Sequence, residues 1–180
     1  GALGTSYQTV NRYTDILEQT FLIRILPPYF ANIGKRLVKS PKVYFRDTGL
    51  LHYFLNVDSE KMLASHPARG ASWEAFIIEE LVAAFSLYFP GSRAYYWRTA
   101  TGAEVDLLVT KGDHLIPFEI KLHTSPGKRD AKPLYSCMED LGIKRAYLIY
   151  PGQEDYSLGE GVTALAAERL LGDPMRLNKL

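Results

Sequence analysis

The chain has 180 residues, with 21 Lys and Arg against 20 Asp and Glu, and its formal net charge is +1. This length suits one domain or two small ones with a real core, and the near-balanced charge excludes a uniformly basic nucleic-acid binder. No apolar run approaches the roughly 20 residues that cross a membrane. The single cysteine, Cys137, excludes an internal disulfide, so we expect a cytoplasmic protein.

The first predicted element is an amphipathic helix. A capping box runs from Thr5 to Gln8, where a Thr hydroxyl and a Gln three residues later can satisfy amides of the first turn. Apolar residues then recur at helical spacing, at Val10, Tyr13, Ile16, Leu17 and Phe21. Gln8, Asn11 and Arg12 lie on other faces of this helix.

Two strands are predicted next, at residues 21–26 and 42–46, with a basic connection between them. Helix, strand, basic loop and strand form an order that resembles a winged helix-turn-helix. Such a segment predicts either DNA binding or docking against another protein module. The residues expected to contact DNA are Gln8, Asn11, Arg12, Lys35, Arg36, Lys39 and Lys42.

The pattern weakens after residue 46, where we place a domain boundary. A short helix is predicted from Asp47, and residues 66–70 are predicted to form a loop. The sequence therefore predicts two units, a partial winged helix at residues 1–60 and an α/β domain at residues 61–180.

The second unit is predicted to have the order α-β-β-β-α-β. A helix at residues 71–89 precedes strands at residues 94–98, 103–109 and 115–122, a helix near residues 131–141 and a strand at residues 145–150. The aromatic run Tyr95-Tyr96-Trp97 is interpreted as core. Residues 161–171 suit a strand or a helix, and both alternatives stay open.

Four charged residues are predicted to meet on the two strands joined by the Gly112-Asp113 turn. If Lys111 faces His114, Asp106 lies opposite Glu119 and Glu104 lies opposite Lys121. All four then share one face of the sheet, because strand side chains alternate. The other face is predicted to be an apolar layer made of Val105, Leu107, Val109, Phe118, Ile120 and Leu122.

Two opposed carboxylates are destabilising unless a cation compensates them. Mg²⁺ or Mn²⁺ is the expected cation, held by Asp106 and Glu119, with Glu74 reaching it from the helix. Lys121 is predicted to assist attack on a phosphate. The alternative is structural: Glu104 and Lys121 form a cross-strand ion pair and Glu74 caps its helix. Glu79 and Glu80 lie off the apolar stripe of that helix and are expected to be solvated.

Asp106, followed after twelve residues by Glu119-Ile120-Lys121, resembles the PD-(D/E)XK nuclease signature, with Glu74 at the position of the helix acid that many members carry. This resemblance implies a restriction-endonuclease-like α/β fold with a mixed sheet, and metal-dependent cleavage of DNA phosphodiesters. The sequence has Val105 where the signature has Pro.

Further stretches, among them Gly70-Ala-Ser-Trp-Glu74 and Tyr96-Trp-Arg98, resemble the C-terminal domain of unknown function of a prokaryotic AAA-type ATPase family. This resemblance implies an ATPase module upstream, since the chain itself has no Gly-rich phosphate loop. Three hypotheses follow: a Mg²⁺- or Mn²⁺-dependent nuclease, an inactive nuclease-like domain that binds DNA or the ATPase module, and a transcription regulator led by the winged helix. The sequence leaves the oligomeric state open.

Overall fold

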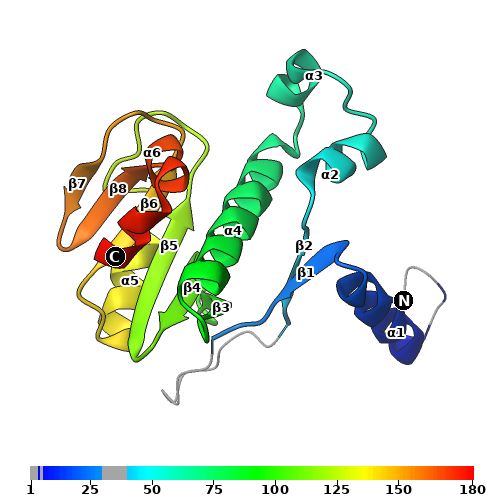
Figure 1. The fold of residues 1–180 in the computed structure, drawn as a ribbon, viewed down its shortest axis with the longest axis horizontal. Helices are drawn as coiled ribbons and strands as arrows, with labels where there is room; N and C mark the ends of the chain where they lie inside the picture. Colours follow the sequence, from blue (N-terminus) through cyan, green and yellow to red (C-terminus); the bar gives the residue numbers. More distant parts are fainter. Residues whose placement is uncertain (1–3, 5, 30–39) are drawn as a thin grey trace.

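The computed structural model describes residue 4, residues 6–29 and residues 40–180. They form a mixed α/β structure, in which a six-stranded mixed sheet lies beside a separate two-stranded antiparallel sheet (Figure 1). No helix within these ranges is long and apolar enough to cross a membrane.

Helix α1 (Tyr7–Gln19) begins at Ser6, whose hydroxyl accepts a hydrogen bond from the Thr9 amide at 3.2 Å. The predicted cap at Thr5 is therefore wrong by one residue, and Thr5 itself lies outside the described residues. The apolar stripe of this helix is exposed, because α1 extends away from the large sheet and none of its described residues is buried (Figure 1).

Strands β1 (Ile23–Leu26) and β2 (Lys42–Phe45) confirm the two strands predicted after the first helix. They pair antiparallel, with Arg24 opposite Tyr44, and the side chain of Leu26 enters the main core. With α1 they reproduce the order helix, strand, strand on which the predicted winged helix rested, and the winged helix itself stays a prediction. The basic connection, with Lys35, Arg36 and Lys39, lies outside the described residues.

Three helices follow the hairpin. Helix α2 (Thr48–Phe54) starts at Asp47 as predicted, because the Asp47 carboxylate accepts the amides of Gly49 and Leu50. Helix α3 (Glu60–Ser65) was not predicted. Helix α4 (Arg69–Tyr88) takes up two residues that were assigned to a loop, Arg69 and Gly70.

The large sheet follows the predicted order of elements. Strands β3 (Arg93–Arg98), β4 (Glu104–Lys111) and β5 (His114–Ile120) precede helix α5 (Lys132–Leu141) and strand β6 (Ala146–Tyr150). The segment left open contains both alternatives, strand β8 (Val162–Ala166) and helix α6 (Ala167–Gly172). Strand β7 (Tyr156–Gly159) and the 3₁₀ helix η1 (Pro174–Lys179) were not predicted.

The strand order is β3-β4-β5-β6-β8-β7, with parallel pairing of β5, β6 and β8 and antiparallel pairing elsewhere. Two apolar clusters lie on opposite faces. One joins the sheet to α4, α6 and η1 and includes Ile77, Leu81 and Phe118. The other joins it to α5 and includes Trp97, Leu134 and Leu148. Tyr96 and Trp97 are both buried, which confirms that they belong to the core.

The β4–β5 hairpin has the predicted register, with Lys111 opposite His114 and Leu107 opposite Phe118. Gly112 has a φ of 58°, the left-handed conformation that a Gly-first turn needs. The register predicted from the turn is confirmed over these pairs.

A β-bulge in β4 interrupts the alternation next to Asp106. On β3 Tyr95 faces Leu108 and Trp97 already faces Val105, so β4 carries one extra residue in this interval. As a result Val105 packs in the cluster under α5, whereas Leu107 packs in the cluster under α4. The prediction that Val105 lies in one apolar layer with Leu107 and Val109 is therefore wrong.

Candidate functional site

Asp106 is the first of two buried acids at the end of the hairpin where β4 begins and β5 ends. Its exposed fraction is 8%, and its Oδ2 accepts the backbone amide of Ile120 at 2.9 Å. The side chain thus satisfies a main-chain donor just beyond the last paired residues of the two strands. This hydrogen bond fixes the carboxylate against β5.

Glu119 is the second buried acid, with an exposed fraction of 3%. Its Oε1 accepts a hydrogen bond from Lys121 Nζ at 2.5 Å. In the described part of the chain, the other oxygen, Oε2, is buried without a hydrogen-bond partner. Such an atom is costly to leave unpaired, so it marks a place where a ligand would be stabilised.

Glu74 joins the site from α4, and Lys42 joins it from β2. Lys42 Nζ lies 2.5 Å from Glu104 Oε1, 3.4 Å from Glu74 Oε1 and 3.5 Å from Asp106 Oδ1. The Tyr44 hydroxyl donates to Glu74 Oε1 at 2.6 Å. We call Lys42, Glu74, Glu104, Asp106, Glu119 and Lys121 the carboxylate cluster.

The alternative structural interpretation assigned Glu104 to an ion pair with Lys121 and made Glu74 a helix cap. Instead, Glu104 pairs with Lys42 and, at 3.3 Å, with Arg98, while Lys121 pairs with Glu119. Helix α4 has no side-chain cap, and Glu74 bonds to Tyr44. Both parts of that interpretation are therefore wrong.

Proton affinities in the cluster are shifted by burial and by mutual repulsion. Burial, with the negative charge of Glu74 adding to it, raises the pKa of Asp106 to about 6. Burial and the negative charge of Asp106 raise the pKa of Glu119 to about 8, against the opposing effect of Lys121. Burial works to lower the pKa of Lys42, but Asp106, Glu74 and Glu104 outweigh it and raise that pKa.

The structure brings the predicted metal ligands near one another, but they do not form a complete set of protein ligands for a metal ion. Among residues 4, 6–29 and 40–180, no group of three or more His, Cys, Asp or Glu side chains is gathered to hold a metal ion. The residues nevertheless fit an ion of the Mg²⁺ class, which needs only one or two carboxylates, with water and substrate supplying other oxygens. The repelling pair Asp106 and Glu119, with the unpartnered Oε2 of Glu119, supplies that minimum.

Glu79 was predicted to be solvated, but its side chain is only 15% exposed and is bound by two arginines. Its carboxylate accepts from Arg24 Nε at 2.5 Å, from Arg24 Nη2 at 2.9 Å and from Arg46 Nε at 2.6 Å. Two strands of the hairpin are thereby joined to one helical carboxylate. Burial works to raise the pKa of Glu79, but these two guanidinium groups outweigh it and lower that pKa. Its neighbour Glu80 is exposed, as predicted.

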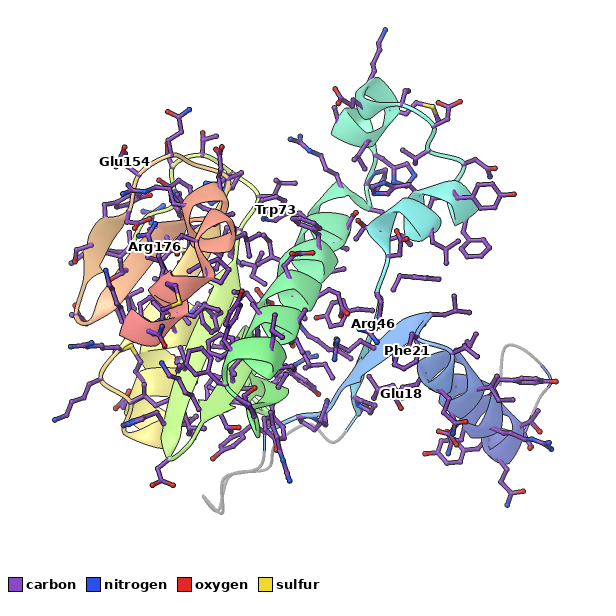
Figure 2. All side chains as sticks on the ribbon, viewed as in Figure 1. Glu18, Phe21, Arg46, Trp73, Glu154 and Arg176 are labelled. Carbon is purple, nitrogen blue, oxygen red and sulfur yellow. The ribbon has the colours of Figure 1, made fainter. Side chains whose placement is uncertain are left out.

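Three of the residues predicted to contact DNA lie apart from the cluster. Gln8, Asn11 and Arg12 are exposed on α1, which lies on the side of the hairpin away from the large sheet (Figure 1). Figure 2 shows Arg46 and Phe21 together where α1 meets the hairpin, and the Arg46 guanidinium carbon lies 5.2 Å from the centroid of the Phe21 ring.

Sequence reasoning missed that side chains of β2 bind acids of α4. Lys42, Tyr44 and Arg46 recur at every second residue, so they share one face of the strand, and the structure turns that face toward α4. The alternation of these three side chains could have shown that they share one face. It could not show their partners, because Glu74 and Glu79 lie on a helix 30 or more residues away.

Two family models match the chain. One, described as a domain of unknown function (DUF4143), matches residues 69–170, and another, described as a domain of unknown function (DUF8612), matches residues 1–61. An uncharacterized protein of Mycobacterium tuberculosis, Rv2008c, and one of Mycobacterium bovis, Mb2031c, are each 41% identical over 170 residues. The match covers 94% of this chain and 37% of each relative, so the chain spans little more than a third of their length.

Proposed function

This chain belongs to the DUF4143 family, and we propose that its α/β unit is a Mg²⁺- or Mn²⁺-dependent nuclease of the PD-(D/E)XK type that acts on DNA. The observation that carries the proposal is the meeting of Asp106, Glu119 and Lys121 at one end of the β4–β5 hairpin. Two carboxylates can hold an ion of the Mg²⁺ class, and such an ion can assist cleavage of a phosphodiester.

Asp106 and Glu119 would hold the ion, with Glu74 as a third candidate from α4. A bound divalent ion supplies an activated water and neutralises charge that develops at phosphorus. The protein positions the two carboxylates. The Ile120 amide orients that of Asp106, and Glu119 lies on β5, between β4 and β6. Lys121 Nζ, half-exposed, can then bind a phosphate oxygen or the attacking water.

DNA is the proposed substrate because the site lies among cations that suit a phosphate backbone. Arg98 and Lys121 lie within an ion-pair distance of the cluster acids, and 46% and 33% of their side chains are exposed. The exposed polar residues Gln8, Asn11 and Arg12 give α1 a second surface of the type that contacts DNA. The partial winged helix is proposed to bind the same duplex from outside the cleavage site.

An ATPase module is proposed as the partner within the same polypeptide. The curated relatives are much longer than this chain, which covers 37% of their length, so they have room for a further domain. The likeness to the C-terminal domain of AAA-type ATPases motivates this assignment. In such an arrangement the ATPase would move DNA or control access to the nuclease unit.

One observation favours a second candidate, an inactive nuclease-like domain that serves for binding alone. The Lys42 ammonium lies between Glu74, Glu104 and Asp106 and offsets part of their negative charge. A cluster with an internal cation of this kind can keep its fold without a metal ion, and therefore without catalysis. This candidate predicts DNA binding without cleavage.

DNA cleavage assays separate the two candidates. Wild-type protein with Mn²⁺ is expected to cleave supercoiled or linear DNA, and Asp106→Asn and Lys121→Ala are each expected to reduce the rate by about 100-fold or more. Asn keeps an oxygen for the Ile120 amide, so the fold should persist. The matched controls are Asp113→Asn, in the hairpin turn, and Lys128→Ala, both exposed, and they should retain wild-type rates.

Two outcomes would count against the nuclease. Cleavage that survives both Asp106→Asn and Lys121→Ala would remove these residues from the site. Absence of cleavage of every substrate by the wild-type protein, together with measurable DNA binding, would favour the inactive domain.

A further inference from the structure

Lys42 reaches the carboxylate cluster from a separate part of the fold. It is the first residue of β2, in the two-stranded sheet, whereas Asp106 and Glu104 belong to the large sheet and Glu74 to α4. Its ammonium nonetheless lies within 3.5 Å of an oxygen of each of these three acids. Only 22% of its side chain is exposed, so it is a component of the cluster and not of the open surface.

The hairpin is held in this place by a row of contacts along one strand face. Two residues beyond Lys42, the Tyr44 hydroxyl bonds to Glu74, and Arg46 then bonds to Glu79. Arg24 of β1 also bonds to Glu79 through two nitrogens. The position of Lys42 is therefore built by several independent contacts between the hairpin and α4.

We infer that Lys42 is an internal counter-cation, which occupies the charge position of the divalent ion and must withdraw before that ion binds. The inference rests on the proposed function, because it concerns the same carboxylates. The single ammonium, 3.5 Å from Asp106 Oδ1, offsets part of the negative charge of the acids while no divalent ion is bound. When a divalent ion takes the same oxygens, two cations in contact range repel each other, so binding and docking of Lys42 compete.

This competition would link metal loading to the position of the hairpin. Because Lys42, Tyr44 and Arg46 share one strand face, withdrawal of Lys42 loosens the neighbouring contacts with Glu74. A partner that pulls the hairpin away from α4, such as DNA bound to the preceding residues, would thereby favour loading of the ion. The hairpin acts as a built-in restraint on the nuclease site.

Calorimetric titration of Mn²⁺ into the full chain tests the inference without any reading of activity. Lys42→Met removes the charge and keeps most of the side chain, so we expect the variant to bind Mn²⁺ at least about tenfold more tightly than the wild type. Lys42→Arg keeps the charge and should leave the affinity within about twofold of wild type, since the cation is retained. Lys61→Met, an exposed lysine on α3, is the matched control and should not change it.

The possible results distinguish this inference from the proposed function. Equal Mn²⁺ affinity in wild type and Lys42→Met would overturn the competition while leaving the nuclease intact. Tighter binding by Lys42→Met, with no cleavage of DNA by either protein, would support the competition and oppose the nuclease. Absence of Mn²⁺ binding to both proteins would overturn both.

A second measurement keeps the inference testable if Lys42→Met fails to fold. Hydrogen exchange of the wild-type chain with and without Mn²⁺ reports directly on β2. We expect the amides of Tyr44 and Arg46 to exchange faster once Mn²⁺ is bound, because docking of Lys42 is lost, while amides of β6 stay protected. Unchanged or slower exchange in β2 at saturating Mn²⁺ would contradict the withdrawal of Lys42.

Discussion

Glu119 and Asp106 are unusual because burial holds two acids of like charge close together. Asp106 accepts the Ile120 amide at Oδ2 and lies 3.5 Å from Lys42 Nζ at Oδ1, whereas Glu119 is bound by Lys121 at one oxygen only among the described residues. Burial raises the pKa of both groups, with the negative charge of Glu74 adding to the shift of Asp106 and that of Asp106 adding to the shift of Glu119, so folding without a divalent ion favours their protonated forms. This imbalance should be measurable as a dependence of stability on pH.

The free energy of unfolding of the metal-free protein is predicted to fall as pH rises from about 4.5 toward 8. In the unfolded state both acids are largely deprotonated across this window, whereas in the folded state Asp106 keeps its proton up to its pKa of about 6 and Glu119 up to its pKa of about 8. The unfolded state therefore binds fewer protons, which makes the slope negative. Urea denaturation at several pH values, with chelator present, measures it.

Asp106→Asn provides the comparison for this pH dependence. It removes one of the two groups and the charge that acts on Glu119, so its stability should depend less on pH over the same window. Glu79, whose pKa is lowered, contributes in the opposite sense but only in the acid range, where its stabilising charge is lost as pH falls. Parallel curves for wild type and Asp106→Asn would contradict this account of the cluster.

At the scale of elements, one carboxylate of α4 binds both strands of the hairpin β1–β2. Glu79 receives both Arg24 and Arg46, one from each strand, and its side chain is only 15% exposed. Its loss would leave two partly buried guanidinium groups without this partner. The contact is therefore expected to matter for stability as well as for the position of Lys42.

Glu79→Gln is predicted to lower the free energy of unfolding by about 1–3 kcal/mol, because charge-assisted hydrogen bonds to two arginines are weakened. Glu80→Gln is the matched control, one residue along the same helix and exposed, and should change it by less than about 0.5 kcal/mol. Chemical denaturation of the three proteins makes the comparison. Equal effects of the two substitutions would show that the hairpin does not depend on Glu79.

The elements that local chemistry determines were predicted well from the sequence. The Gly112-Asp113 turn gave the correct register of β4 and β5, and Asp47 marked the start of α2. The bulge in β4 was not predictable, because Val105, Asp106 and Leu107 alternate apolar and polar as in a regular strand. The extra residue is evident only from the pairing with β3. Short elements such as α3 and β7 carry too few residues for a clear periodicity.

The candidate site was likewise predictable only where local chemistry determines it. Asp106, Glu119 and Lys121 were placed by the hairpin, and the structure brings them together. The role of Lys42 could not be inferred from its own segment, which is basic and resembles a DNA-contacting surface. Its acidic partners come from α4 and β4, so the contact depends on tertiary packing that no local pattern encodes.

At the scale of the whole molecule, two parts matched by different family models share one core and one site. Leu26 of the hairpin is buried with Ile77 of α4, and Lys42 completes the charge balance of Asp106. One model ends at residue 61 and the other begins at residue 69, yet the carboxylate cluster draws on both matched stretches. The predicted division into residues 1–60 and 61–180 stays a prediction, and the cluster combines residues from both of these units.

The most direct test of the account is a crystal structure of the wild-type chain grown with Mn²⁺, with anomalous scattering used to locate the ion. The account predicts an anomalous peak at about 2.1 Å from carboxylate oxygens of both Asp106 and Glu119, with Lys42 Nζ displaced from Asp106. An ordered cluster without a peak at saturating Mn²⁺, in which Lys42 still contacts Asp106, would contradict it.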